Sequence, residues 1–217
     1  RALIPRPETE QLVELVRRWA IDRDTPPGSV RLVRRPTGEP RASLLDNALD
    51  IGTGSGAIAL SLAAEDISGR VVGIDISDGA LEQAIENCRR VGLDSRVEFR
   101  KAGDDPFACL DPAERFELIV SNPPYVSDAE LAVLPVEIRD FEPPEALRGG
   151  VDGLALIRRI AQRAAEFLSP TGALWLEIGS GQAAAVTDVL SGAGKWADVE
   201  AYADLAGHPR FVRAVPG

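Results

Sequence analysis

The chain has 217 residues, a length that fits one sizeable α/β domain around a single hydrophobic core. Hydrophobic residues make up 45% of it, and no run approaches the roughly 18 apolar residues that a membrane span needs, which excludes a membrane partner. The net charge of −10 disfavours direct nucleic-acid binding, because phosphate contacts usually need a basic surface, and favours a protein or small-molecule partner.

The cysteine and histidine content bears on metals and on the compartment. Cys88 and Cys109 stand far apart and form neither a C-x-x-C pair nor a disulfide framework. With His208 as the one histidine, they make a poor ligand set, so we expect no metal. Free thiols indicate a cytoplasmic protein. The chain starts at Arg1, contains no Met and has no signal-peptide pattern, so we expect a fragment of a longer protein.

The first predicted element is a helix that opens at Pro7, a residue suited to the first helical turn. Glu8 and Glu10 complement the positive end of the helix dipole there. Apolar residues at helical spacing predict one buried face, formed by Leu12, Leu15, Val16 and Trp19. Residues 24–45 then break the pattern with prolines, glycines and arginines, which indicates an irregular insertion, a loop or a loose hairpin. A solvated loop explains its arginines better than RNA contacts do.

Short apolar strands alternate with helices from residue 45 onward. Strands are predicted at residues 48–51, 70–75, 97–101, 117–121 and 172–178. Helices are predicted at residues 57–64, 78–91, 152–168 and 182–190. This repeated order predicts a parallel sheet covered by helices on both faces. Residues 196–205 and 211–215 are expected to close the sheet as an antiparallel pair.

Two further features belong to the second half of the chain. Residues 126–150 are rich in prolines and acids and look like an inserted lid on the substrate side. Asp152 is expected to cap the helix that follows. The inward face of that helix is predicted to hold Leu154, Ile157, Ile160, Ala161, Ala164 and Phe167.

A glycine-rich turn lies between the first strand of the sheet and the next helix, and reads Asp50-Ile51-Gly52-Thr53-Gly54-Ser55-Gly56. Its G-x-G-x-G spacing differs from the dinucleotide G-x-G-x-x-G pattern, and no lysine follows to make a phosphate-binding loop. Asp75 stands nineteen residues after Gly56, at the end of the next strand, where a carboxylate can accept hydrogen bonds from both hydroxyls of a ribose. Asp104 follows the third strand and could meet an adenine amino group.

Together these residues predict a nucleoside site at the carboxyl ends of adjacent strands. Two alternatives explain the same residues less well. A tight turn without a ligand leaves the spacing to Asp75 without a reason, and a dinucleotide dehydrogenase requires a different glycine spacing.

A second motif, Asn122-Pro123-Pro124-Tyr125, follows the fourth strand. The lone pair of an amide or aromatic amino nitrogen is delocalised, so methyl transfer to it needs acceptors that draw on both N–H groups. The Asn122 side-chain oxygen and the Pro123 carbonyl can do this and can stabilise the positive charge that develops. The prolines stiffen the loop, and Tyr125 offers a ring face to a planar group. The alternative is an ordinary proline-rich turn.

The sequence resembles the HemK/PrmC family, the protein-(glutamine-N5) methyltransferases that act on peptide-chain release factors. The glycine-rich turn and the Asn-Pro-Pro-Tyr motif are shared with many amino-methyltransferases. Two other stretches are more specific to the family. They are Leu3-Ile4-Pro5-Arg6-Pro7-Glu8-Thr9-Glu10 and the segment from Phe141-Glu142-Pro143 through Ala146-Leu147 and Gly150 to Asp152-Gly153-Leu154.

The resemblance implies a doubly wound, Rossmann-like, S-adenosylmethionine-dependent methyltransferase fold with a seven-stranded, mostly parallel sheet and an antiparallel C-terminal strand. It implies methyl transfer from S-adenosylmethionine to a glutamine in the Gly-Gly-Gln motif of release factors, with S-adenosylhomocysteine as product, and we expect a monomer. The family's small helical N-terminal domain is expected to be absent, and residues 24–45 are longer than expected.

The resemblance also implies site residues. The cofactor-binding set is Gly52, Thr53, Gly54, Ser55, Gly56, Asp75, Asp104, Asp105 and Asn122. The catalytic set is Asn122, Pro123, Pro124 and Tyr125. The Arg6-Pro7-Glu8-Thr9-Glu10 stretch is expected to line the same cleft, without assigned roles. Two rival functions are an N6-adenine methyltransferase acting on DNA or RNA, disfavoured by the two specific stretches and the acidic charge, and a binding module that has lost catalysis, disfavoured by the intact motifs.

Overall fold

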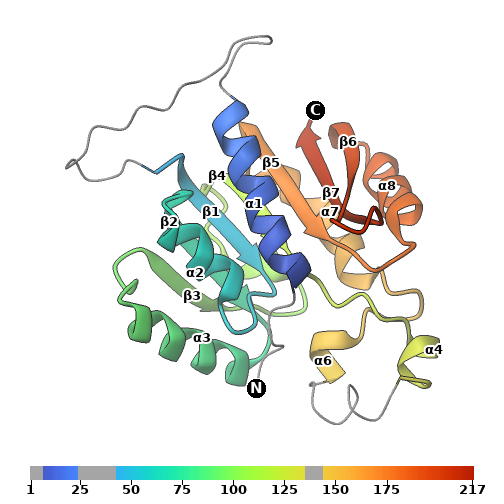
Figure 1. The fold of residues 1–217 in the computed structure, drawn as a ribbon, viewed down its shortest axis with the longest axis horizontal. Coiled ribbons are helices and arrows are strands. Elements are labelled where there is room, and N and C mark those ends of the chain that lie inside the picture. Colours follow the sequence, from blue (N-terminus) through green and yellow to red (C-terminus); the bar gives the residue numbers. More distant parts are fainter. Residues whose placement is uncertain (1–6, 24–42, 135–143) are drawn as a thin grey trace.

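The computed structural model describes residues 7–23, 43–134 and 144–217 as a seven-stranded sheet with helices on both faces (Figure 1). The strands are β1 (Leu45–Ile51), β2 (Ser68–Asp75), β3 (Val97–Lys101), β4 (Phe116–Ser121), β5 (Leu168–Glu177), β6 (Trp196–Ala203) and β7 (Pro209–Pro216). Their order in the sheet is β3-β2-β1-β4-β5-β7-β6. The strands from β1 to β5 pair in parallel, and β7 runs antiparallel to both β5 and β6. This confirms the predicted fold class, including the antiparallel last strand.

The helices of the described residues follow the predicted alternation. They are α1 (Pro7–Asp22), α2 (Ala57–Ala64), α3 (Asp78–Val91), the 3₁₀ helix η1 (Pro106–Cys109), α4 (Asp128–Leu131), α6 (Pro144–Leu147), α7 (Ala155–Phe167) and α8 (Ala183–Gly192). Gly92 ends α3 in a left-handed conformation with a φ of 71°, which a residue without a Cβ adopts without strain.

The structure moves the starts of β1 and β5 to earlier residues than predicted. Leu45, the last residue assigned to the insertion, already belongs to β1 and pairs with Ser68, whereas residues 24–42 lie outside the described part of the chain. Strand β5 begins at Leu168, directly after α7, and not at Gly172. The reason is that Leu168 pairs with Phe116 and the register then shifts, so the sheet accepts residues that carry no regular apolar pattern.

Asp152 does not cap α7, contrary to the sequence-based expectation. The residue at the N-cap is Leu154, which makes no side-chain capping bond. Asp152 lies two residues earlier, where its Oδ1 accepts a hydrogen bond of 3.3 Å from the Leu154 N–H and its carboxylate pairs with Arg158. The Asp152 carboxylate therefore links the segment before α7 to Arg158 in the first turn of the helix.

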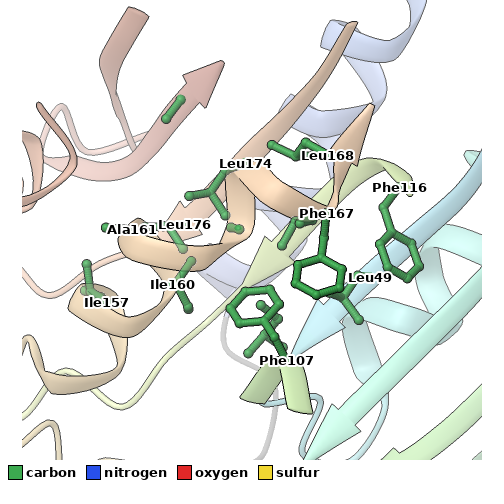
Figure 2. Packing of buried hydrophobic residues seen from close by; sticks show 14 of the residues in the cluster. Leu49, Phe107, Phe116, Ile157, Ile160, Ala161, Phe167, Leu168, Leu174 and Leu176 are labelled. Carbon is green, nitrogen blue, oxygen red and sulfur yellow. The ribbon is translucent and has the colours of Figure 1, made fainter. Parts of the chain in front are cut away.

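Neighbouring residues along each strand enter two separate hydrophobic layers. Leu174 and Leu176 of β5 join the layer covered by η1, α7 and α8, while Ala173 and Trp175 join the layer covered by α1, α2 and α3. In the first layer the rings of Phe107 and Phe167 stack with centroids 5.1 Å apart (Figure 2). Burial on both faces explains why a central strand such as β4 reads as an almost continuous apolar run.

Two properties of the fold bear on function. Across the described ranges, no helix has both the length and the apolar character that crossing a membrane requires. The chain moves outward from β1 to β2 and β3 and then returns to place β4 on the other side of β1. Open α/β sheets bind ligands at the carboxyl ends of the strands beside such a reversal.

Candidate active site

The glycine-rich turn after β1 adopts a conformation that its sequence makes possible. Gly52, Gly54 and Gly56 have φ values of 70°, 58° and 82°, in the left-handed region that side chains disfavour. A Cβ on Gly56 would also lie 3.1 Å from the Phe99 ring and 3.2 Å from Ala84. The third glycine therefore permits close packing of α2 against β3 and α3, while the first two shape the turn.

Asp50 lies under this turn and is fully buried. Its Oδ2 accepts a hydrogen bond of 2.7 Å from the Thr53 hydroxyl and one of 3.2 Å from the Ala59 N–H. Burial raises the pKa of Asp50 to about 7, since the low-polarity surroundings disfavour the charged form more than these two bonds favour it. The Asp50 carboxyl thus ties the turn to the first residues of α2.

Asp75 is the last residue of β2 and lies beside the glycine-rich turn. Its Oδ2 accepts a hydrogen bond of 2.8 Å from the Gly54 N–H, and its Oδ1 accepts one of 2.8 Å from the Ser77 N–H. A carboxylate oxygen can accept more than one hydrogen bond, so each oxygen keeps capacity for a hydroxyl of a ligand. Backbone donors hold the carboxylate in place without an ion pair.

A cavity of about 400 Å³ opens at these strand ends. Eight of the residues proposed for the site line it, namely Gly52, Thr53, Gly54, Ser55, Asp75, Asp104, Asn122 and Pro124. Ile76, which is 52% exposed, adds an apolar wall directly after Asp75. Acceptors for ribose hydroxyls, an apolar wall for a base and a volume within the usual range for small-molecule sites fit a nucleoside ligand.

Asn122 forms the far wall of this cavity, just beyond β4. Its Nδ2 donates a hydrogen bond of 3.4 Å to the hydroxyl of Thr9, a residue of the first turn of α1 that also lines the cavity. Asn122 and Pro124 of the Asn-Pro-Pro-Tyr motif therefore line the same cavity as Asp75 and the glycine-rich turn.

Known proteins with similar sequences point to one family. A family model described as a methyltransferase domain matches residues 45–195. The release factor glutamine methyltransferase of Burkholderia pseudomallei is 43% identical over 206 residues, which cover 94% of this chain and 65% of that protein. The protein of the same name from Cereibacter sphaeroides is 41% identical over 201 residues, covering 91% of this chain and 69% of that protein.

The chain belongs to the release factor glutamine methyltransferase family. It spans about two thirds of the length of the relatives that it matches, with 65% coverage of the proteins from Burkholderia pseudomallei and Koribacter versatilis.

Solved structures agree with this family on the fold. The human METTL16 catalytic domain in complex with a MAT2A 3′UTR hairpin superposes with a TM-score of 0.69 at 15% identity, covering 99% of this chain and 72% of that one. The N-terminal domain of human METTL16 in complex with SAH gives a TM-score of 0.66 at 16% identity, with the same coverage. These similarities establish a methyltransferase fold of the Rossmann-like type.

Four residues proposed for the site lie outside the cavity lining. Gly56 is the N-cap residue of α2, and Pro123 is buried. Asp105 caps η1, where it accepts a bond of 3.0 Å from the Phe107 N–H and pairs with Arg163 at 2.7 Å. An acid directly before a proline at the start of a helix is a capping signal. This signal distinguishes Asp105, which caps η1, from Asp104, which lines the cavity.

Tyr125 is the fourth of these residues. The Arg210 guanidinium lies over its ring at 5.5 Å from the centroid. Its backbone carbonyl accepts a hydrogen bond of 3.0 Å from Gln182, whose Oε1 in turn accepts one of 2.9 Å from the Gly179 N–H. The loop after β4 is thus fastened to the end of β5 and the start of α8.

Several lining residues were not singled out from the sequence as individual site residues. Ala146, Arg148 and Gly150 come from the predicted lid, and Arg159 comes from α7. The helical period places Arg159 away from the inward face of α7. Its guanidinium donates a hydrogen bond to the Asp104 backbone carbonyl. No sequence pattern identified Arg159 as a residue of the cavity. Arg148 is paired with Asp128 at 2.7 Å, and this bond lowers the pKa of Asp128. Among the residues that the structure describes, no group of three or more His, Cys, Asp or Glu side chains could hold a metal.

Proposed function

We propose that the chain transfers a methyl group from S-adenosylmethionine to the side-chain amide nitrogen of the glutamine in the Gly-Gly-Gln motif of peptide-chain release factors. The observation that carries the proposal is the position of Asn122, which lines the same cavity as Asp75 and the glycine-rich turn. The names of the relatives supply the substrate class. The net charge of −10 supports a protein substrate over a nucleic acid.

The cofactor supplies an electrophilic methyl group on a positively charged sulfur. The two Asp75 oxygens would accept hydrogen bonds from the ribose hydroxyls, and Gly52 and Gly54, which have no side chains, would allow close approach of the cofactor to the backbone. The Asp104 carboxylate accepts a hydrogen bond from the adenine amino group, and Ile76 packs against the base. These assignments rest on the lining of the cavity and on the fixed position of the Asp75 carboxylate.

The remaining chemistry belongs to the loop after β4. The Asn122 Oδ1 accepts one N–H of the substrate amide, and the Pro123 carbonyl accepts the other. Both bonds strengthen as the nitrogen becomes positive, so they stabilise the transition state more than the ground state. They would also fix the orientation of the substrate nitrogen for attack on the methyl group.

Tyr125 is proposed to stack on the planar substrate amide. Because Arg210 covers one face of the ring, the opposite face is the one that can receive the substrate. Residues 135–143 of the predicted lid lie outside the described part of the chain. The described residues 144–150 would cover the bound glutamine, a role supported by the three of them that line the cavity. We further propose that the reaction takes place in the cytoplasm, where translation terminates.

The test uses labelled cofactor with three substrates: a release factor, the same release factor with its motif glutamine changed to alanine, and adenine-containing RNA and DNA. We expect label on the first substrate alone. Label on the nucleic acids and not on the release factor would instead establish the N6-adenine alternative. Equal labelling of the two release factors would place the methyl group elsewhere on the protein.

A further inference from the structure

Thr9 occupies an unusual position for a threonine. It is only 7% exposed, yet it lines the cavity beside Asn122. It comes from the first turn of α1, which packs on β5 and α2 and lies lengthwise over the sheet between β1 and β5 (Figure 1). Thr9 and Asn122, which share a hydrogen bond, are 113 positions apart in the sequence, so only the packing of α1 on the sheet brings them together.

The second partner of Thr9 is Glu177, the last residue of β5. The Thr9 hydroxyl donates a hydrogen bond of 2.9 Å to Glu177 Oε2, and Glu177 is 0% exposed. A buried carboxylate requires compensation, and the Arg210 guanidinium supplies a positive charge 4.0 Å from Glu177 Oε1. Glu177 is therefore held in place by β5 and by the positive charge of Arg210.

These contacts determine which way the Asn122 amide points. A threonine hydroxyl has one proton, and here that proton goes to Glu177. The hydroxyl oxygen can then only accept from Asn122, which must turn its NH₂ group toward Thr9. The Asn122 Oδ1 is left on the other side of the amide as the acceptor for a ligand. Without this arrangement, the two ends of the amide could exchange places by a half turn.

We propose that Thr9, held by Glu177, is a positioning residue that keeps the Asn122 carbonyl oxygen directed at the substrate nitrogen. This inference rests on the proposed function, and it gives a role to a residue of the Arg6-Pro7-Glu8-Thr9-Glu10 stretch. Thr9 transfers no proton and contributes through the orientation of Asn122. The alternative is that Thr9 only anchors α1 to β5, and the two roles predict different measurements.

The first measurement is independent of any substrate. The side-chain NH₂ group of Asn122, assigned by its loss in Asn122→Ala, is followed by ¹⁵N relaxation. We expect an order parameter near that of rigid backbone, about 0.85, in the wild type and in Thr9→Ser, and a value below about 0.6 in Thr9→Val. Thr187→Val, the same change on α8 outside the cavity, is the control. An unchanged order parameter in Thr9→Val overturns the proposal.

The second measurement is turnover on the release factor, with cofactor affinity and melting temperature measured in parallel. Thr9→Val should lower kcat by roughly 10- to 100-fold, as misplacement of a reacting group does, while KM and cofactor affinity stay within about twofold. Thr9→Ser keeps the hydroxyl and should restore most of kcat. The double variant Thr9→Val/Asn122→Ala should be no slower than Asn122→Ala, because both changes remove one function.

The outcomes separate the two proposals. If the wild type leaves the release factor unlabelled but the Asn122 amide loses its order in Thr9→Val alone, the proposed function fails and the positioning role stands. If the wild type is active and the effects of Thr9→Val and Asn122→Ala multiply, Thr9 acts independently of Asn122 and the positioning role fails. A mere anchor of α1 would lower the melting temperature and leave kcat of the folded protein unchanged.

Discussion

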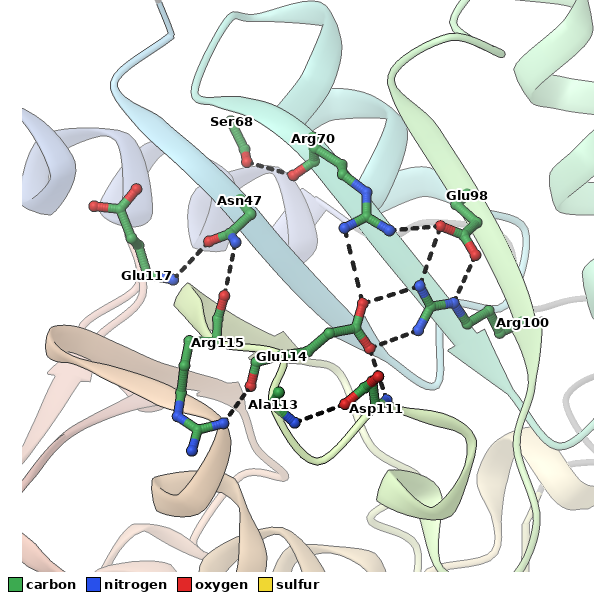
Figure 3. Close-up of polar contacts among 10 residues, drawn as sticks. All are labelled: Asn47, Ser68, Arg70, Glu98, Arg100, Asp111, Ala113, Glu114, Arg115 and Glu117. Atoms are coloured by element: carbon green, nitrogen blue, oxygen red, sulfur yellow. Dashed lines mark hydrogen bonds and ion pairs between the residues drawn. The ribbon is translucent and has the colours of Figure 1, made fainter.

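The cavity at the carboxyl ends of β1 and β2 and the ion-pair cluster beside β2 and β3 both contain carboxylates, but they give those carboxylates different partners. The ion-pair cluster consists of Arg70, Glu98, Arg100 and Glu114 (Figure 3). Arg100 bonds to Glu98 at 2.6 Å and to Glu114 at 2.8 Å, and Arg70 bonds to Glu98 at 2.7 Å. Each carboxylate of the cluster thus meets an arginine and is engaged within the protein.

Asp50 and Asp75, beside the glycine-rich turn, accept hydrogen bonds from backbone N–H groups and a hydroxyl. The consequences for protonation are opposite. Hydrogen bonding from Arg100 lowers the pKa of Glu98 to about 2, whereas burial raises the pKa of Asp50 to about 7. Arginine partners thus favour a charged carboxylate, and burial among neutral donors favours a protonated one. Asp75, which lines the cavity, is held by two backbone N–H groups, so its oxygens keep capacity for a ligand.

The largest expected effect is that of Asn122→Ala on methyl transfer. The change removes one of the two proposed acceptors, and loss of one preorganised transition-state hydrogen bond costs about 100- to 1000-fold in turnover. Asn122→Asp keeps an acceptor and should retain partial activity. Single-turnover methyl transfer to the release factor, with cofactor binding in parallel, measures both. If turnover stays near normal, or if cofactor binding falls as far as turnover, Asn122 is structural.

Asp75→Ala tests whether the cavity acid binds a ligand. Losing hydrogen bonds to a charged acceptor should weaken binding of S-adenosylhomocysteine by about 1.5–3 kcal/mol, which is about 10- to 150-fold. Titration calorimetry gives the affinity. Glu114→Ala, which removes an acid of the ion-pair cluster, should leave that affinity within about twofold. If Asp75→Ala leaves the affinity unchanged, as is expected of Glu114→Ala, Asp75 does not bind the ribose.

Asp50 should make stability depend on pH. Its folded pKa lies above its unfolded value, so the folded state holds a proton that the unfolded state releases, and stability falls as pH rises from about 4 to about 7. Between about pH 5.5 and pH 7.5 this term is about 2 kcal/mol. Urea unfolding of wild type and Asp50→Asn at both pH values isolates it, since all other titrating groups are shared. Parallel pH dependences in the two proteins would contradict the assignment.

The smallest effect is expected for Glu98→Gln in the ion-pair cluster, with the opposite pH dependence. Because the folded pKa is lowered, its contribution is present above about pH 4.5 and is lost as pH falls toward about 2. The Glu98 side chain is 46% exposed, so water screens the pair and the cost at neutral pH should stay below about 1 kcal/mol. Urea unfolding should show the difference shrink at about 1 M salt. A loss of stability well above about 1 kcal/mol in Glu98→Gln would show that the cluster contributes more than exposed ion pairs usually do.

Local patterns determined much of this protein. The alternation of apolar strands with amphipathic helices predicted the layered sheet, since each element must bury one face or both. The glycines of residues 52–56 and the acid at Asp75 predicted one wall of the cavity, because left-handed turns and strand-end carboxylates depend on residues close in sequence. The Asn-Pro-Pro-Tyr motif predicted the far wall through its place after β4.

Tertiary structure alone decided which neighbours those residues meet. Asp104 and Asp105 are adjacent acids, yet the 3₁₀ helix that starts at Pro106 turns one toward its own cap and leaves the other at the cavity. The Thr9 contact with Glu177 spans 168 residues. Periodicity and turn signals report interactions within a few residues, whereas such a contact depends on how α1 packs across the sheet, and packing is set by all the side chains between the two layers.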